Sequence, residues 1–191
     1  MQRDSDNPTL ILRELDSRLN HAVELTLIGK SAVWLGYDDP PEGFGATADV
    51  DAVVPAEYSE VMDHDLAFWE SLKEANAALE RFGLYLSHIF EQHSVFLRAD
   101  WAAHRVRVTR PVTNHLGLFR PATLDLILTK MMRGDDPQHM EEIQWMIHKD
   151  HISKQDMAAC LAVAVIPDDD PVWQELFQQA KTAVLAMSYE S

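Results

Sequence analysis

Two short apolar runs around a turn-rich segment constrain the fold of this chain more than any other feature. The first run covers residues 23–28 and stops at Gly29, and the second covers residues 48–54. Both runs contain β-branched residues and have turn-forming neighbours, which predicts two β-strands. Residues 30–35 fit a short helix, and the Pro/Gly-rich residues 38–45 fit a loop. We therefore expect the order strand, glycine, helix, loop and strand.

The second predicted strand carries two aspartates, Asp49 and Asp51, with one residue between them. Side chains two positions apart on a strand point to the same face, so both carboxylates are expected to project together from a rigid element. Aspartate is disfavoured in strands, and divalent cations such as Mg²⁺ prefer oxygen ligands. The pair therefore predicts a cation site, with a solvated strand face as the alternative.

Apolar spacing along the rest of the chain predicts further helices and strands. Asn7 and Pro8 suit the start of a first helix, as a capping side chain and a first-turn ring. Before residue 121 the predicted helices cover residues 8–21, 56–62 and 65–82, and the predicted strands cover residues 84–90, 94–97, 105–109 and 116–119. In residues 105–109 arginines and valines alternate, so the arginines are expected to share a face.

From residue 121 onward the sequence predicts helices alone, at residues 121–132, 137–149, 153–165 and 171–187. The expected fold class is therefore α/β, in the α+β sense of a mixed sheet flanked by helices, with a C-terminal helical segment. The expected division is an α/β domain over residues 1–120 and a helical segment over residues 121–191 that packs on it.

The net charge of −15 restricts the partners that this chain can bind. Long-range repulsion disfavours a large nucleic acid unless a local basic patch or a partner helps, whereas a nucleotide carried with its metal stays compatible. The one cysteine, Cys160, cannot form an internal disulfide, which suits a reducing compartment. No apolar run reaches the roughly 20 residues needed to span a bilayer. We therefore expect a cytoplasmic protein without a membrane partner.

The order of strand, glycine, short helix, loop and D-x-D strand resembles the nucleotidyltransferase superfamily of the DNA polymerase β type. The residues that carry this resemblance are Gly29, Ser31, Asp49 and Asp51, and Thr47 adds the T-x-D-h-D form found in small bacterial members. Residues 120–147 are similar to the helical part of small bacterial nucleotidyltransferase-like proteins. Those proteins are related to the toxins of AbiE-type toxin–antitoxin systems and to an adjacent family of unknown function.

Within residues 120–147, the positions that match this pattern are Asp125, Lys130, Arg133, Glu141, Glu142 and Ile143. Lys130 lies on an otherwise apolar helix face. It is expected to act either as a charge partner of the acidic site, and so to contact the bound nucleotide, or as a lysine whose stem packs on that face.

The resemblance implies metal-dependent transfer of a nucleoside monophosphate from a nucleoside triphosphate to a hydroxyl acceptor, with release of pyrophosphate. Asp49 and Asp51 would bind Mg²⁺ or Mn²⁺, and Gly29 and Ser31 would hold the phosphates at a helix start. Lys30 departs from the glycine or serine that is common at its position, so it would either add a phosphate contact or block the turn.

Such sites usually contain a third carboxylate on an adjacent strand, which completes the metal site and activates the acceptor hydroxyl. Here the predicted strand over residues 84–90 offers Ser87 and His88 at the expected position, with Glu91 just beyond and Asp100 as a further candidate. We take Glu91 as the third catalytic residue beside Asp49 and Asp51. His88 is either a packed core histidine or a general base.

The sequence supports two functions of different classes. The first is a nucleotidyltransferase whose acceptor is RNA, a protein or a small molecule. The second is a catalytically weakened relative that acts as a binding module or as the partner of an antitoxin-like protein. A third possibility is an α/β protein without a nucleotide site, in which the two aspartates face water. The presence or absence of the third acid discriminates between the first two.

Overall fold

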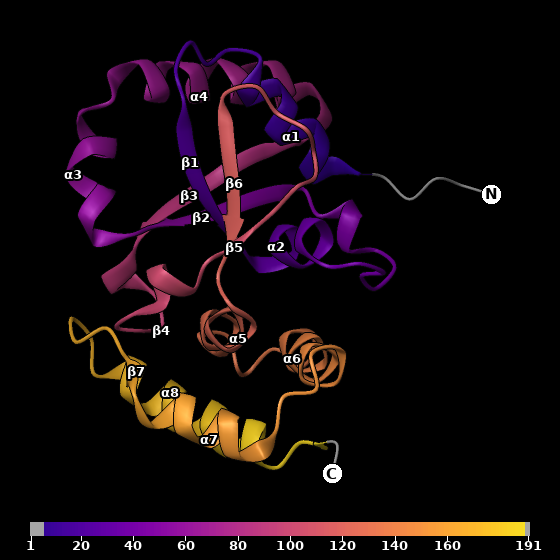
Figure 1. Cartoon of the computed structure of the whole chain (residues 1–191), viewed down its shortest axis with the longest axis vertical. Coiled ribbons are helices and arrows are strands. Elements are labelled where there is room, and N and C mark those ends of the chain that lie inside the picture. The colour runs from indigo at the N-terminus through magenta and orange to yellow at the C-terminus, as the bar shows by residue number, and fades with distance from the viewer. Residues whose placement is uncertain (1–5, 190–191) are drawn as a thin grey trace. The chain divides into compact units, whose positions relative to one another are not determined.

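A computed structural model describes residues 6–189 of the chain, and the chain divides into two compact units (Figure 1). The first unit extends to Glu91 and also includes Arg105–Arg120. The second comprises Gln92–His104 together with the chain from Pro121 onward. Within residues 6–189 no helix combines the length and the apolar character needed to cross a membrane.

The first unit contains a five-stranded mixed sheet, which confirms the predicted α/β fold class. Its order is β3-β2-β1-β6-β5, and the strands are β1 (Val23–Ile28), β2 (Asp49–Val54), β3 (Tyr85–Glu91), β5 (Val106–Arg107) and β6 (Leu116–Arg120). Strand β1 is antiparallel to β2 and parallel to β6. Strand β2 is parallel to β3, and β5 is antiparallel to β6.

The helices of the first unit are α1 (Asn7–Asp16), α2 (Gly29–Gly36), α3 (Ala56–His64) and α4 (Leu66–Leu79). One face of the sheet carries buried apolar side chains such as Leu25, Ala52 and Leu118. Helices α1, α2 and α4 contact the strands, and Arg120 on the apolar face donates to the Gly36 carbonyl at the end of α2. Helix α2 therefore lies against the apolar face.

The opposite face of the sheet carries polar groups along its strands. Glu24 and Thr26 of β1 lie on this face with Asp51 of β2, because Thr26 pairs with Val53 and Ile28 with Asp51. Arg105 and Arg107 lie there too, since both guanidinium groups lie over the Phe119 ring. This contact confirms that the two arginines share a face. We call this side of the sheet the polar face.

The second unit contains α5 (Thr123–Met131), α6 (Pro137–Lys149), α7 (Lys154–Ala162) and α8 (Val172–Leu185). The prediction of helices alone from residue 121 onward was wrong, because β7 (Ala164–Val165) follows α7 and pairs with β4 (Leu97–Arg98). The predicted strand over residues 94–97 is likewise mostly wrong, since residues 92–94 form a 3-10 turn.

An ion pair explains why residues 92–104 belong to the second unit. Arg98 donates to both carboxylate oxygens of Asp125 on α5, at 3.0 and 2.6 Å, and its backbone N–H donates to the same carboxylate at 3.1 Å. Asp125 is fully buried, so these bonds compensate for the removal of its charge from water. The hydrogen bond to Asp125, opposed in part by burial, raises the pKa of Arg98.

Helix α1 begins and ends differently from the prediction. Its cap is Asp6, which accepts from the Thr9 N–H at 3.3 Å, whereas Asn7 donates its amide N–H to the Thr47 carbonyl at 3.1 Å. The helix ends at Asp16 instead of continuing to residue 21. Both differences arise from tertiary contacts that local sequence patterns do not contain.

Asp16 ends α1 and connects it to the start of β6. Its carboxylate accepts from the backbone N–H groups of Asn114, His115 and Leu116 at 2.9, 2.7 and 2.9 Å. Burial alone would raise the pKa of Asp16, but these donors outweigh it and the pKa lies below the ordinary value of 3.8. One carboxylate thus fixes the entry to β6 across about a hundred residues of sequence.

Replacing this carboxylate should destabilise the first unit. We expect Asp16→Ala to lower the free energy of unfolding by on the order of 3 kcal/mol, because three backbone N–H groups lose a charged acceptor and the one on Leu116 is buried. Urea denaturation measures the change, with Asp63→Ala on the exposed side of α3 as the control.

The stabilisation that the Asp16 carboxylate provides should weaken at low pH. Because folding lowers the pKa of Asp16, its contribution is present above pH 3.8 and is lost as the pH falls through the lower folded value. The difference between wild type and Asp16→Ala should therefore shrink as the pH falls from about 5 to about 3. A difference that is constant over this range would contradict the role assigned to the charge.

Candidate functional site

The candidate site begins at the turn between β1 and α2. Gly29 has a φ of +67°, in the left-handed region that glycine adopts without strain. A Cβ atom placed on Gly29 would lie 4.0 Å from Oδ2 of Asp51, so the turn adjoins that carboxylate. The first N–H groups of α2 have no partner within the helix. The predicted order of strand, glycine and helix is confirmed at this turn.

Ser31 lies in the first turn of α2, but its hydroxyl serves the local structure. The side chain is buried, with 1% exposure, and donates to the Ile28 carbonyl at 3.0 Å. Ser31 can therefore contact a ligand through its backbone N–H, because its hydroxyl is already bonded. Lys30 precedes it and is half-buried, and the positive φ needed for the turn falls on Gly29. The bulk of Lys30 therefore does not block the turn.

Asp49 and Asp51 occupy β2 as the sequence predicts. Burial alternates along the strand, with both aspartates half-buried and Val50 buried between them, which confirms that the aspartates share a face. Each carboxylate accepts from a hydroxyl group. Thr47 donates to Oδ1 of Asp49 at 2.9 Å, and Ser87 donates to Oδ1 of Asp51 at 2.5 Å. These bonds fix the orientation of both carboxylates.

A β-bulge in β3 brings two side chains opposite Asp51. Val50 pairs with Leu86 and Asp51 pairs with His88, so Ser87 is an extra residue on β3. The Ser87 hydroxyl and the His88 ring both contact Asp51 Oδ1, the ring through Nδ1 at 3.3 Å. The sequence shows both residues near the site but carries no signal for the bulge that unites them.

The structure places Glu91 away from the aspartate pair. Glu91 ends β3 opposite Val54, three residues beyond His88, which corresponds to about 10 Å along a strand. The rings of His88 and Phe90 stack at 5.2 Å and so share a face, and alternation directs Glu91 to the other face. Among residues 6–189 no three histidine, cysteine, aspartate or glutamate side chains form a group that could hold a metal.

Two other candidates belong to the second unit. Asp100 is exposed and contacts His104 at 3.1 Å. Lys130 is buried on α5 and forms an ion pair with the buried Glu142 of α6. Burial, followed by the charge of Lys130, lowers the pKa of the neighbouring His139. Lys130 thus has a structural partner inside its own unit, and its contact with a nucleotide stays a prediction.

The two aspartates fit one Mg²⁺ ion better than a pair of ions. Asp49 and Asp51 each have one oxygen engaged by a hydroxyl group and a second carboxylate oxygen available. Mg²⁺ commonly binds one or two carboxylates and completes its shell with water and substrate phosphates. A two-metal site of the kind that the resemblance implies needs a further carboxylate ligand. The two carboxylates could therefore hold one Mg²⁺ ion whose remaining ligands come from elsewhere.

Comparison of the chain with protein-family models, with curated proteins and with solved structures finds no match. The assignment of function therefore rests on the residues and the geometry of the site.

The strain at the Gly29 turn can be measured against a second glycine. We expect Gly29→Ala to lower the free energy of unfolding by about 1–2 kcal/mol, because alanine is strained at positive φ. Gly43 has a φ of +88° with no atom near its Cβ position, so Gly43→Ala should cost a similar amount. Urea denaturation compares the two variants. A Gly29→Ala protein as stable as wild type would show that this turn has another conformation.

Proposed function

We propose that this chain is a nucleotidyltransferase-like protein that binds a nucleoside triphosphate with Mg²⁺ at the corner formed by α2 and β2. The observation that carries the proposal is the left-handed turn at Gly29, which brings the start of α2 against Asp51. Donors for phosphate oxygens and carboxylates for a cation thus adjoin each other where β1 ends and β2 begins.

Each group at this corner has a role in holding the ligand. The first N–H groups of α2 donate to phosphate oxygens, and the ammonium of Lys30 adds positive charge there. Asp49 and Asp51 hold the cation, which neutralises the triphosphate. Thr47 and Ser87 keep the two carboxylates in place before the ligand arrives.

The charge of the chain also favours a ligand that arrives with its metal. With a net charge of −15, the protein repels a free triphosphate. Mg²⁺ reduces the charge of that triphosphate and at the same time offers coordination positions to the two carboxylates. Binding should therefore depend strongly on the divalent cation.

The arrangement supports binding better than rapid catalysis. The residue opposite Asp51 is His88, and Glu91 lies farther along β3. A nucleotidyl transfer needs a base for the acceptor hydroxyl and charge stabilisation at the phosphorus. With two carboxylates, the corner holds the metal–nucleotide but supplies less of that stabilisation than a three-carboxylate site.

Removing both charges at the corner should abolish nucleotide binding. We expect Asp49→Asn/Asp51→Asn to lose Mg²⁺-dependent binding of all four nucleoside triphosphates, by at least about a hundredfold in Kd, because no carboxylate remains for the cation. The amide oxygens still accept from Thr47 and Ser87, so the fold is retained. Isothermal titration calorimetry with and without Mg²⁺ measures the effect.

The matched control removes two exposed carboxylates from α3 of the same unit, in Glu60→Gln/Asp63→Asn. This control should bind as wild type does, which excludes an effect of overall charge. Equal binding by the wild type and by the Asp49/Asp51 variant, or no binding by either, would contradict the proposed site.

A second candidate function is the transfer reaction itself, with His88 as the base. The specific observation in its favour is that the His88 ring is 66% exposed and lies against Asp51. When Nδ1 carries the proton and donates to Asp51, Nε2 is left to accept the proton of an acceptor hydroxyl. The hydroxyl oxygen then attacks the α-phosphorus, and pyrophosphate leaves.

Transfer can be tested with α-labelled nucleoside triphosphates, total RNA and total protein as acceptors. If His88 is the base, His88→Ala should lower labelling by about a hundredfold or more and leave Mg²⁺–nucleotide binding within about twofold. His64→Ala on α3 is the control, because His64 is exposed and its ring contacts the backbone carbonyl of Glu60 in its own helix. Binding without labelling in wild type would support the binding function alone.

A further inference from the structure

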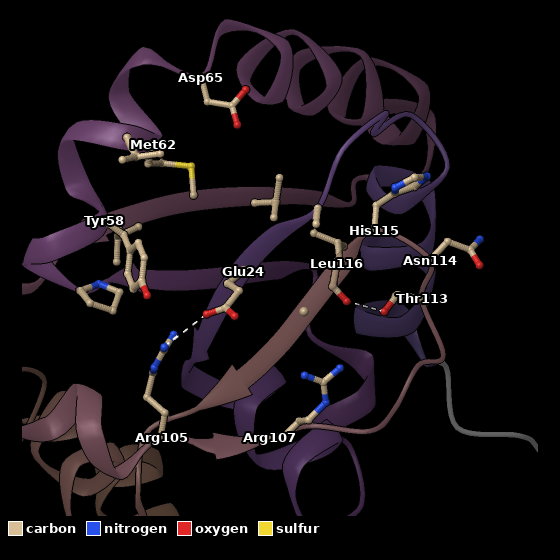
Figure 2. Close-up of a pocket in the computed structure, with 16 residues that line it drawn as sticks. Glu24, Tyr58, Met62, Asp65, Arg105, Arg107, Thr113, Asn114, His115 and Leu116 are labelled. Atoms are coloured by element: carbon tan, nitrogen blue, oxygen red, sulfur yellow. Dashed lines mark hydrogen bonds and ion pairs between the residues drawn. The ribbon is translucent and has the colours of Figure 1, made fainter.

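We infer that the first unit has a second ligand site, separate from the corner of α2 and β2, which binds a compact organic anion with an apolar body. The site is a pocket of about 530 Å³ between α3, the start of β1 and the segment that enters β6 (Figure 2). This volume lies in the range of small-molecule sites, about 300–1,000 Å³. The inference does not depend on nucleotide binding.

The pocket and the aspartate pair lie toward opposite ends of the polar face. Strand β1 contributes Val23 and Glu24 to the pocket, whereas Ile28 at its other end pairs with Asp51. Four residues of strand separate Glu24 from Ile28, which corresponds to about 13 Å. A ligand in the pocket and a phosphate group at the corner would therefore occupy different places.

The segment that enters β6 holds its side of the pocket in a fixed conformation. Asn114, His115 and Leu116 line the pocket, and their backbone N–H groups are the three that donate to Asp16. The Thr113 hydroxyl donates to the Leu116 carbonyl at 2.6 Å. The segment needs no ordering when a ligand binds, and a preformed site loses less entropy on binding.

Helix α3 and the end of β2 supply an apolar wall. Figure 2 shows Tyr58 and Met62 of α3 on one side of the pocket, with Glu24 of β1 next to them and Arg105, just before β5, reaching up to Glu24. Tyr58 is 48% exposed and Val61 is 67% exposed, although both are large apolar residues in contact with the pocket. An apolar ligand body would remove this surface from water.

Among the arginines that line the pocket, one has a guanidinium group that is available to bind a ligand. Arg105 pairs with Glu24 at 3.3 Å, and Asp65 pairs with His21 at 2.6 Å. Arg107 is exposed and lies over the Phe119 ring, and no carboxylate in the described part of the chain pairs with it. The acidic groups are thus already matched, and the guanidinium of Arg107 is available to an anion.

These features define the chemistry of the ligand. A carboxylate, sulfonate or phosphate can accept two parallel hydrogen bonds from the Arg107 guanidinium, while an aromatic or aliphatic body contacts Tyr58 and Val61. A polyanion is disfavoured because Glu24 and Asp65 lie in the same pocket. The expected ligand therefore carries one anionic group and a compact apolar body.

The test uses naphthalene-1-sulfonate and its neutral sulfonamide as probes of nucleotide-free, full-length protein. Binding is followed through backbone amide shifts in two-dimensional NMR. We expect the sulfonate to shift the amides of Val61, His115 and Gly117, and the sulfonamide to bind about tenfold more weakly or worse, because it lacks the charge that pairs with Arg107.

Two variants separate the pocket from nonspecific attraction. Arg107→Gln should weaken sulfonate binding about tenfold and bring it to the level of the sulfonamide. Arg81→Gln is the matched control, since Arg81 is also an exposed arginine over a phenylalanine ring, at 4.6 Å from Phe82, and it should leave binding unchanged. Equal affinities for the two probes, equal losses in the two variants, or shifts outside the pocket would overturn the inference.

Discussion

The antiparallel pairing of β1 with β2 determines where the functional groups of the first unit lie. Because Ile28 pairs with Asp51, the chain that leaves β1 turns at Gly29 directly beside the carboxylate. The same pairing leaves Glu24 at the other end of the polar face, in the pocket next to α3. A slip of one residue would move both aspartates to the apolar face, where unpaired carboxylates are costly.

Helix α1 fixes this arrangement from both of its ends. At its start, Asp6 accepts from the Trp34 indole of α2 at 2.8 Å, and Asn7 holds the carbonyl of Thr47, whose hydroxyl donates to Asp49. At its end, Asp16 holds the entry to β6. The corner of α2 and β2 and the pocket beside α3 are therefore both connected to one helix, and neither needs the second unit for these contacts.

Local sequence patterns predicted the elements that meet at the corner, because each has a short-range signal. The apolar run that stops at Gly29 predicted β1 and the turn. The two aspartates among valines predicted a strand that holds both carboxylates on one face. The bulge at Ser87 could not be predicted, since register between β2 and β3 depends on packing across the sheet. The same limit explains why the sequence could not locate the third acid. Glu91 is close to His88 in sequence, but in the sheet it lies opposite Val54.

The most direct test of the proposed site is paramagnetic relaxation by Mn²⁺ bound to a nucleoside triphosphate. Mn²⁺ can replace Mg²⁺ at carboxylate sites and broadens the amide signals of nearby residues. Mn²⁺–ATP should first broaden the amides of Gly29, Lys30, Asp49 and Asp51. Broadening spread evenly over the acidic surface, or none at Gly29 and Asp51 when ATP is saturating, would contradict the proposed site.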